Sequence, residues 1–220
     1  MTHVAAIVFD FDGLLMDTES CMLASWQQEW RHHGLELDLD TFWVDHGGDV
    51  TEDRYDRLAA QVGPSYDRAS SHARRIAHRD ALHRELELNP GIGDWLDDAR
   101  RLGLRLAVAS SSPVAWVRGL LTGVGRERDF EFICGGDEVD APKPAPDVYQ
   151  LAVDRLGLRP ESAVAVEDTP HGVAAAHAAG LRCIAIPNPH TDQRRFGVAD
   201  LVLATADSMP LHQALERCAH

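Results

Sequence analysis

Acidic side chains follow two apolar runs of the sequence in short, dense groups. Asp10 and Asp12 come directly after the run over residues 4–9, and Glu167 and Asp168 come directly after a second run. Carboxylates this close repel one another, and burying each of them costs free energy. A divalent cation removes that penalty, and a ligand set made of oxygen atoms favours Mg²⁺. We therefore predict a magnesium site formed by these four acids.

A cation and several hydroxyl groups stand in segments that are suited to phosphate binding. Ser110, Ser111 and Ser112 follow another apolar run, and Lys143 lies between two prolines in the segment APKPAP. A lysine ammonium, serine hydroxyls and loop amides together can hold a phosphate group. A carboxylate beside Mg²⁺ and a bound phosphate can attack phosphorus, and a second carboxylate two residues further on can exchange the protons. These residue types therefore support phosphoryl transfer.

Each of these groups, taken alone, also has a simpler structural interpretation. Asp12-Gly13 is a common turn pair, the three serines could cap a helix that begins at Pro113, and Lys143 could be a solvated loop residue. A shared site requires that the chain bring the groups together. In open α/β sheets, ligands bind beyond the carboxyl ends of the strands, so a parallel sheet would do this.

The pattern of apolar runs predicts such a sheet. Short runs rich in Val, Ile and Ala alternate with segments of helical periodicity, and this alternation is typical of a mostly parallel, Rossmann-like α/β sheet covered on both faces. We expect strands over residues 4–9, 104–110, 130–136, 162–168, 181–187 and 199–203, and helices over 113–125, 145–157 and 171–180.

Residues 16–88 have a different character and predict an inserted helical domain. They are rich in His, Arg and Asp and contain no convincing buried strand, while Leu23, Trp26 and Trp30 fall on one helical face. We interpret this face as the core of the insertion rather than as a ligand platform. The predicted domains are therefore an α/β core over residues 1–15 and 89–220 and a helical insertion over 16–88.

Composition and charge argue against several classes of function. The chain has 220 residues and a formal net charge of −14, which disfavours nonspecific binding to nucleic acid or to an anionic membrane. Its four cysteines are widely spaced without a CxxC pair, as is typical of reduced thiols in a cytoplasmic protein. No apolar run approaches the length of a membrane span, and the N-terminus lacks a signal-peptide pattern. We expect a cytoplasmic monomer whose partner is a small phosphorylated metabolite.

Four pieces of the sequence together resemble one known family. The pieces are DFDGLLMDTE, AVASSSP, APKPAPDVYQLA and VAVEDTPHGVAAAHAAG. The four pieces occur in this order in the haloacid dehalogenase (HAD) superfamily, which the sequence therefore resembles. More narrowly, it resembles the β-phosphoglucomutase-like and sugar-phosphatase branch with a helical cap. The pieces frame nearly the whole chain, and residues 16–88 take the place of the cap. The resemblance implies an HAD-like fold with Mg²⁺ as cofactor.

The resemblance also implies roles for the two acids near the N-terminus. Asp10 matches the nucleophile of the family. Asp12 matches the general acid/base, which also gives Mg²⁺ its backbone carbonyl. The dehalogenase and phosphonatase branches of the family generally lack an acid at the position of Asp12, so its presence here indicates phosphoryl transfer.

The same resemblance implies how the other residues contribute. Ser110 and Lys143 match the groups that hold the transferring phosphoryl, and we expect Ser111 to add to the phosphate seat. Asp168 matches the main remaining metal carboxylate, with Glu167 assisting directly or through water. The implied function is a Mg²⁺-dependent phosphatase that acts on a small phosphomonoester such as a sugar phosphate, through an aspartyl-phosphate.

Other functions remain open at this point. A β-phosphoglucomutase-like phosphomutase shares the core chemistry but must hold a second phosphate, and the segment FWVDHGGDVTEDR is poor in basic residues. His46, Asp49 and Arg54 in this segment are the candidate substrate contacts of the cap. Outside the enzymes, the alternatives are a non-catalytic sensor of a phosphorylated ligand and a protein-interaction module. The intact acid pair near the N-terminus argues against the sensor.

Overall fold

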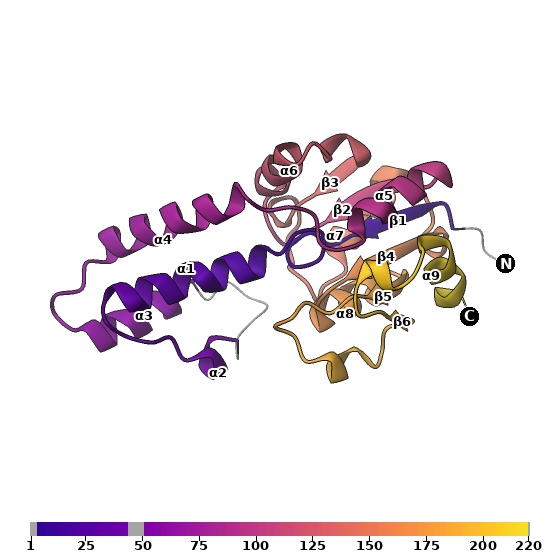
Figure 1. The fold of residues 1–220 in the computed structure, drawn as a ribbon. Helices are drawn as coiled ribbons and strands as arrows, with labels where there is room; N and C mark the ends of the chain where they lie inside the picture. The colour runs from indigo at the N-terminus through magenta and orange to yellow at the C-terminus, as the bar shows by residue number, and fades with distance from the viewer. Residues whose placement is uncertain (1–3, 44–50, 220) are drawn as a thin grey trace. The chain divides into compact units, whose positions relative to one another are not determined.

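The predicted strands form a six-stranded parallel sheet (Figure 1). Its strands are β1 (Ala6–Phe9), β2 (Arg105–Ala109), β3 (Phe132–Cys134), β4 (Ala163–Glu167), β5 (Arg182–Ala185) and β6 (Leu201–Val202). They lie in the order β3-β2-β1-β4-β5-β6, and every neighbouring pair is parallel. All residues of the central strands β1 and β4 are buried, as continuous apolar runs covered on both faces should be. The predicted α/β fold class is confirmed.

Two compact units make up the chain. The computed structural model describes residues 4–43 and 51–219. The sheet unit comprises residues 1–17 and 87–220, and the helical unit comprises residues 18–86. Met16 forms isolated bridges with Asp12 and Leu88, so the segments that leave and re-enter the sheet unit are paired within it. Among the described residues, every helix is too short or too polar to serve as a membrane span.

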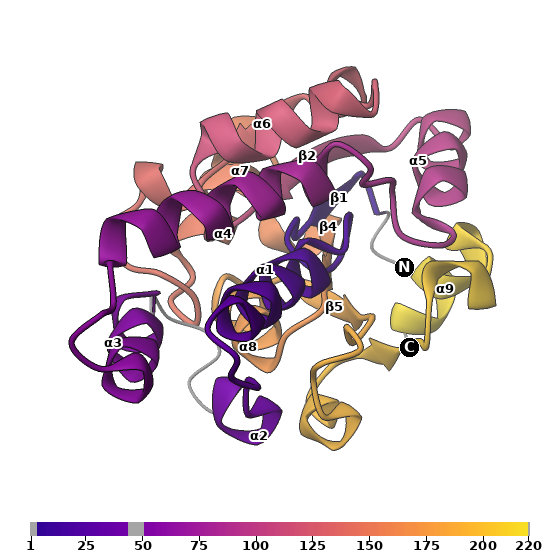
Figure 2. The ribbon, with the colours of Figure 1, turned by 60° about the vertical axis from the view of Figure 1, so that its left-hand side comes forward.

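Helices cover both faces of the sheet (Figure 2). The helices α7 (Asp147–Leu156) and α8 (Pro170–Ala178) pack on one face and share a core with β1, β2 and β4. The helices α5 (Ile92–Arg101) and α9 (Leu211–Cys218) contact one another and pack against the other face. A further helix, α6 (Val114–Gly123), packs beside β3.

Local sequence signals mark the start of α8 and the end of α7. Thr169 caps α8, since its side chain accepts a hydrogen bond from the Gly172 amide, and Pro170 takes the first helical position. Gly157 ends α7 with φ at 62°, a left-handed conformation that favours glycine. Because α8 starts so soon after β4, Asp168 is held in a very short connection at the end of the sheet.

The helical unit has its own small core, as predicted. Trp26 is 1% exposed and packs against Tyr55, with their ring centroids 4.5 Å apart. Leu23 and Trp30 pack against the same cluster, which confirms their interpretation as core residues. The helices of this unit are α1 (Thr18–His32), α2 (Leu39–Phe42), α3 (Thr51–Val62) and α4 (Arg68–His83), and α1 packs along α4 (Figure 1).

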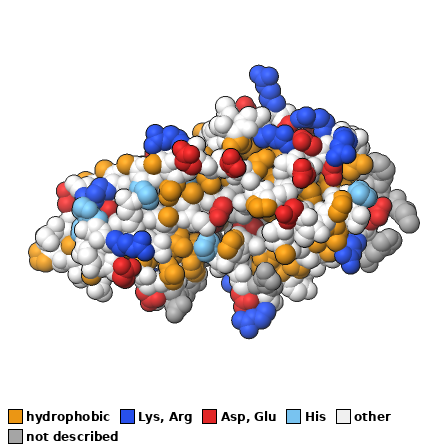
Figure 3. Space-filling model, in the orientation of Figure 1, with side chains coloured by type: hydrophobic (Ala, Val, Ile, Leu, Met, Phe, Trp, Pro, Cys, Tyr) orange, Lys and Arg blue, Asp and Glu red, His pale blue; other side chains and the backbone are white. Residues whose placement is uncertain are grey.

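Charged side chains of both signs are interspersed on the face drawn in Figure 3. Several of the exposed charges form ion pairs within the sheet unit. Arg126 lies 2.9 Å from Asp97, and Arg155 lies 2.8 Å from Glu138. Exposed pairs of this kind contribute about 1 kcal/mol or less each. The surface charge therefore does little to hold the fold together, and the buried charges described below are more informative.

Candidate active site

Asp10 and Asp12 lie in a tight loop directly after β1. The Asp10 amide donates a hydrogen bond to the Val166 carbonyl at 2.9 Å, which continues the pairing of β1 with β4. Gly13 then turns the chain with φ at 83°. A Cβ atom at Gly13 would lie 2.2 Å from Oδ2 of Asp168. Glycine at this position is thus required both by the turn and by the close approach of the Asp168 carboxylate.

Three buried carboxylates meet beside this loop. Asp10, Glu167 and Asp168 each offer one oxygen, and these oxygens lie within 4.8 Å of one another. None of the three residues is more than 7% exposed. A buried set of carboxylate oxygens has the chemistry that Mg²⁺ prefers, so the residues fit the predicted ion. Within the described part of the chain, the Asp12 side chain does not join this group; the resemblance implied its backbone carbonyl as the ligand.

Lys143 supplies positive charge to the same place. Its Nζ atom donates hydrogen bonds to Asp10 Oδ1 at 2.6 Å, to Glu167 Oε1 at 2.6 Å and to the Ala109 carbonyl at 2.9 Å. An ammonium has three N–H donors, so these acceptors use all of them. Burial disfavours the charged ammonium, but Asp10 and Glu167 outweigh it and raise the pKa of Lys143. The lysine is therefore charged and held in one position.

Glu167 is surrounded by donors on both carboxylate oxygens. Oε1 accepts from Lys143 and from the Tyr149 hydroxyl at 2.9 Å. Oε2 accepts from the Asp168 amide at 3.0 Å and from the Thr169 amide and hydroxyl at 3.2 Å each. A Cβ atom at Gly172 would lie 1.8 Å from Oε1, so glycine makes room for this carboxylate. With these donors in place, Glu167 is well suited to orienting Lys143.

The buried group contains three acids and one lysine, and the pKa of Asp10 is raised within it. Burial raises the pKa of Asp10 to about 7; Lys143 opposes this rise and Glu167 adds to it. Burial is the largest cause of this rise, and offsetting it needs more positive charge than Lys143 provides. A cation bound to the three carboxylates would supply that charge and lower the proton affinity of Asp10. This charge imbalance is the second reason why the residues fit Mg²⁺.

The three serines of the AVASSSP segment lie in different surroundings. Ser110 is 1% exposed, and its hydroxyl accepts a hydrogen bond from the Ser112 amide at 3.0 Å. Ser112 Oγ donates to Asp12 Oδ2 at 2.6 Å, and Ser110 Oγ lies 3.4 Å from the same oxygen. Ser111 is exposed. The structure thus brings Ser110 beside the predicted acid/base, while phosphate binding by Ser110 and Ser111 stays a prediction.

The structure adds three polar neighbours that the sequence analysis missed. Trp116 Nε1 donates to Asp12 Oδ1 at 3.0 Å. Asn188 Nδ2 donates to Asp168 Oδ2 at 2.6 Å, and the Tyr149 hydroxyl reaches Glu167 as described above. Tyr149 and Trp116 lie on predicted helices, and Asn188 follows shortly after the predicted strand over 181–187. Their position near strand ends was a usable signal, but periodicity alone does not say which helical side chain points to the site.

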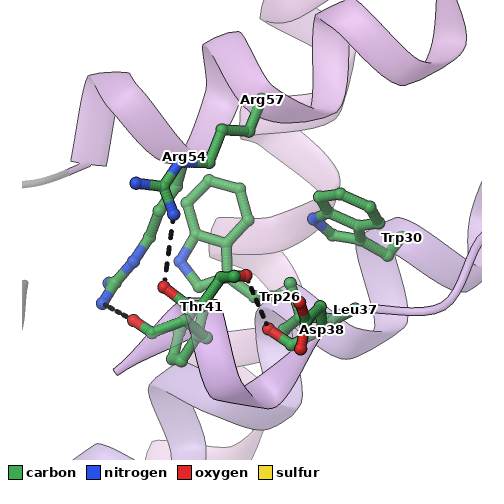
Figure 4. Close-up of a pocket in the computed structure, with 8 residues that line it drawn as sticks. Trp26, Trp30, Leu37, Asp38, Thr41, Arg54 and Arg57 are labelled. Atoms are coloured by element: carbon green, nitrogen blue, oxygen red, sulfur yellow. Dashed lines mark hydrogen bonds between the residues drawn. The ribbon is translucent and has the colours of Figure 1, made fainter. Parts of the chain in front are cut away.

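The candidate contacts of the helical unit remain predictions. His46 and Asp49 lie outside the described residues. Arg54 is 8% exposed; its guanidinium stacks 4.0 Å from the centroid of the Phe42 ring and donates to the Phe42 carbonyl at 3.3 Å. Arg54 also borders a pocket beside Trp26 and Phe42 (Figure 4). These contacts hold the arginine within its own unit.

Comparison with known proteins identifies the family. A model of the haloacid dehalogenase-like hydrolase family matches residues 7–186. The protein YhcW of Bacillus subtilis is 33% identical to this chain over 97% of both chains. The fructose-1-phosphate phosphatase YqaB of Escherichia coli is 29% identical, over 82% of this chain and 95% of its own.

Solved structures agree with the sequence comparisons. CbbY from Rhodobacter sphaeroides, crystallised in complex with phosphate, superposes with a TM-score of 0.76 at 32% identity, over 97% of this chain and 99% of its own. A mutant of CbbY in complex with xylulose-(1,5)bisphosphate superposes with a TM-score of 0.73 at 32% identity, over 92% of this chain and 95% of its own. The resemblance seen in the sequence is thereby confirmed, and the chain belongs to the haloacid dehalogenase-like hydrolase family.

Proposed function

We propose that this protein is a Mg²⁺-dependent phosphatase that hydrolyses a sugar phosphate through a phosphorylated Asp10. The observation that carries the proposal is the buried group of Asp10, Glu167 and Asp168 around the ammonium of Lys143. This group lies beyond the carboxyl ends of the two central strands, where open α/β sheets bind their ligands. The wider assignment as a hydrolase of phosphoric monoesters also has the support of its relatives.

Asp10 is the nucleophile in the first step. One of its oxygens is held by Lys143, which leaves the carboxylate oriented beside the phosphate seat. A bond forms between an Asp10 oxygen and phosphorus, and the bond from phosphorus to the leaving oxygen breaks. Asp12 gives its proton to that oxygen, so that the departing group leaves as a neutral alcohol.

Water completes the cycle in the second step. Asp12, now ionised, takes a proton from the water as its oxygen attacks phosphorus. The bond from phosphorus to Asp10 breaks, inorganic phosphate is released and both carboxyl groups return to their starting state. The positive charge of Lys143 and the hydroxyls of Ser110 and Ser111 stabilise the negative charge on the phosphoryl oxygens in both steps, which is where electrostatic stabilisation contributes most.

Asp10, Asp168 and the Asp12 carbonyl would hold the magnesium ion, with Glu167 assisting directly or through water. When bound, the ion supplies positive charge that offsets the negative charge of the carboxylates and of the phosphate. Two observations support this assignment: the oxygen-only donor set and the raised pKa of Asp10.

The relatives support a sugar phosphate as the substrate class. YqaB is a fructose-1-phosphate phosphatase, and the CbbY mutant was crystallised with xylulose-(1,5)bisphosphate. Both relatives match most of this chain, which supports the same substrate class for this protein. A screen of sugar phosphates would show which one is used.

The test is a screen of sugar phosphates with the wild-type protein and with Asp10→Asn, with Mg²⁺ or with EDTA. Wild type should release inorganic phosphate only with Mg²⁺, and Asp10→Asn should lose at least about 1000-fold in kcat because its amide is a far weaker nucleophile. Asp94→Asn is the matched control, since Asp94 is exposed on α5 and should keep full activity. Undiminished turnover by Asp10→Asn would refute the nucleophile assignment.

The same screen separates the alternatives. A phosphomutase would convert a sugar phosphate into an isomer with little release of inorganic phosphate. A sensor would bind the ligand, as a shift in unfolding temperature, without changing it. Either result would overturn the proposed phosphatase activity.

A further inference from the structure

We propose that Trp116 is a positioning residue that fixes the Asp12 carboxylate for proton transfer, with Ser112 as its partner. The proposal deepens the proposed function and rests on it, because there Asp12 exchanges the protons. Trp116 Nε1 donates to Asp12 Oδ1 at 3.0 Å, and Ser112 Oγ donates to Asp12 Oδ2 at 2.6 Å. A carboxylate held at both oxygens by two donors has a fixed orientation. We call these two donors the Asp12 clamp.

The segment that carries the clamp is itself firmly held. The Ser112 carbonyl accepts from the Gly136 amide at 3.0 Å, and the Val114 amide donates to Asp137 Oδ1 at 2.9 Å. Trp116 follows within the first turn of α6, where the helical backbone restricts its rotamers. The two donors are therefore in place before any ligand binds, which is what a positioning device requires.

The chemistry of the clamp suits positioning rather than proton transfer. An indole N–H only donates, so Trp116 cannot accept a proton from Asp12. The two donors bind different oxygens of the Asp12 carboxylate. The clamp thus restricts the rotation of Asp12 without taking part in the proton transfer.

Loss of the indole N–H should lower the rate more than the affinity. In Trp116→Phe an aromatic ring remains, but Asp12 Oδ1 loses its indole donor, so the carboxylate is held less firmly. Misplacing a catalytic group costs up to about 100-fold in rate, so we expect kcat to fall about ten-fold or more. KM should change less than about two-fold, because neither clamp residue is assigned to phosphate or metal binding.

The chain offers a matched control for this substitution. Trp95 Nε1 donates to the Met209 carbonyl at 2.9 Å, a hydrogen bond of similar length on α5. Trp95→Phe removes the same N–H group from a structural position and should leave kcat unchanged. Urea unfolding of both variants checks that each is folded under the assay conditions. A loss of kcat in Trp95→Phe equal to that in Trp116→Phe would contradict the positioning role.

A double-mutant cycle tests whether Trp116 acts through Asp12. The substrate is p-nitrophenyl phosphate, because its leaving group departs readily without a proton and keeps the Asp12→Asn variant measurable. Adding Trp116→Phe to Asp12→Asn should cause little further loss, since the residue that it positions has already been altered. If Trp116→Phe lowers kcat by the same factor in both backgrounds, or in neither, the inference is wrong.

A readout without turnover distinguishes failure of the clamp from failure of the proposed function. In ¹⁵N-labelled protein, the indole resonance that disappears in Trp116→Phe should move in Asp12→Asn, while the Trp95 indole resonance stays in place. An unmoved Trp116 resonance means that the clamp does not exist, whatever the activity. If the resonance moves but the wild type hydrolyses no phosphomonoester, the proposed function fails and the positioning role fails with it. If the wild type is active and Trp116→Phe matches it, only the positioning role fails.

Discussion

The two units of the chain both bury charged side chains, but they balance the charges differently. In the helical unit, Glu29 is 2% exposed and receives two hydrogen bonds from Arg74, at 2.6 and 3.1 Å, and one contact from His33 at 3.1 Å. In the sheet unit, the buried group of Asp10, Glu167 and Asp168 faces the ammonium of Lys143. The first group is paired acid to base, and the second has more acids than lysine.

The pKa values of the buried carboxyl groups in the two units shift in opposite directions. Burial opposes ionisation of Glu29, but hydrogen bonds from Arg74 and Ser71 outweigh it and lower its pKa. Burial raises the pKa of Asp10 to about 7, although Lys143 opposes the rise. In a balanced buried group each charge is compensated, whereas an excess of buried charge costs stability. The imbalance therefore supports the proposal that the sheet unit carries the chemistry.

Among the partners of the buried carboxylates, Lys143 should have the largest effect when it is removed. Lys143→Met should lower kcat at least about 100-fold, because a fixed positive charge beside the phosphoryl group is lost. It should also lower the free energy of unfolding by about 3 kcal/mol or more in EDTA, since the buried carboxylates lose their counter-charge. Mg²⁺ should restore more of that stability in the variant than in the wild type. Kinetics and urea unfolding, each with Mg²⁺ and with EDTA, measure these effects.

Arg74→Met is the control from the balanced group. It removes the cation beside Glu29 and should destabilise the protein without any dependence on Mg²⁺. Its kcat, measured per folded molecule, should stay near the wild-type value. Equal responses of the two variants to Mg²⁺ would show that the imbalance has nothing to do with a metal.

The residues of the unbalanced group could be predicted from the sequence, whereas those of the balanced group could not. Asp10, Lys143 and Glu167 could be predicted to meet because Asp10 and Glu167 stand at the ends of strands, Lys143 stands in a loop that leads into a helix, and parallel strands share one edge. Most strand ends were predicted one or two residues beyond the observed end, as for 104–110 against Arg105–Ala109. Polar residues at strand ends continue the extended backbone without pairing, so sequence cannot separate them from the strand.

Other features could not be predicted because they depend on packing in three dimensions. The helix α5 went unrecognised although Ile92, Trp95, Leu96 and Ala99 are buried at helical spacing, because it follows directly after the predicted boundary between residues 88 and 89. The partners of the site acids, such as Trp116, reach them from helices whose rotation about their axes is set by the core. Periodicity places a residue on a helical face but does not specify what that face meets.

The next largest effect is on stability. In EDTA, the contributions of Asp10 and Glu29 to the free energy of unfolding should depend on pH with opposite signs. Asp10 binds protons more tightly in the folded protein than when unfolded, so its contribution to stability falls as the pH rises from about 4 to 7, by about 4 kcal/mol at most. Glu29 binds protons less tightly when folded, so its contribution is present above its unfolded pKa and is lost as the pH falls through its lowered pKa. At pH 8, Asp10→Asn should therefore be more stable than the wild type, and Glu29→Gln less stable.

Urea unfolding from pH 5 to pH 8 checks both signs. The advantage of Asp10→Asn over the wild type should shrink toward pH 5, where the folded wild type already carries the proton. Glu29→Gln should stay below the wild type throughout this range, by about 1 to 3 kcal/mol. An Asp10→Asn variant that is destabilised at pH 8 would contradict the charge imbalance of the sheet unit.

The smallest expected effect concerns two tyrosines that donate one hydrogen bond each. The Tyr149 hydroxyl donates to Glu167 Oε1 at 2.9 Å in the unbalanced group, and the Tyr66 hydroxyl donates to Ser71 Oγ at 3.1 Å in the helical unit. Replacing either tyrosine with phenylalanine keeps the ring and should cost about 1 kcal/mol of stability, slightly more at Tyr149 because its acceptor is charged.

Only the Tyr149→Phe variant should also lose activity. Without its hydroxyl, Glu167 Oε1 keeps Lys143 as its donor, and the pair that holds the ammonium in place is less rigid. A shift of the ammonium weakens its contact with the phosphoryl oxygens most where their charge is largest, so kcat should fall about three-fold while KM changes little. Tyr66→Phe should keep its kcat at the same loss of stability. If both variants keep kcat, the tyrosine beside Glu167 stabilises the fold alone, and the functional part of the unbalanced group ends at the carboxylates and the lysine.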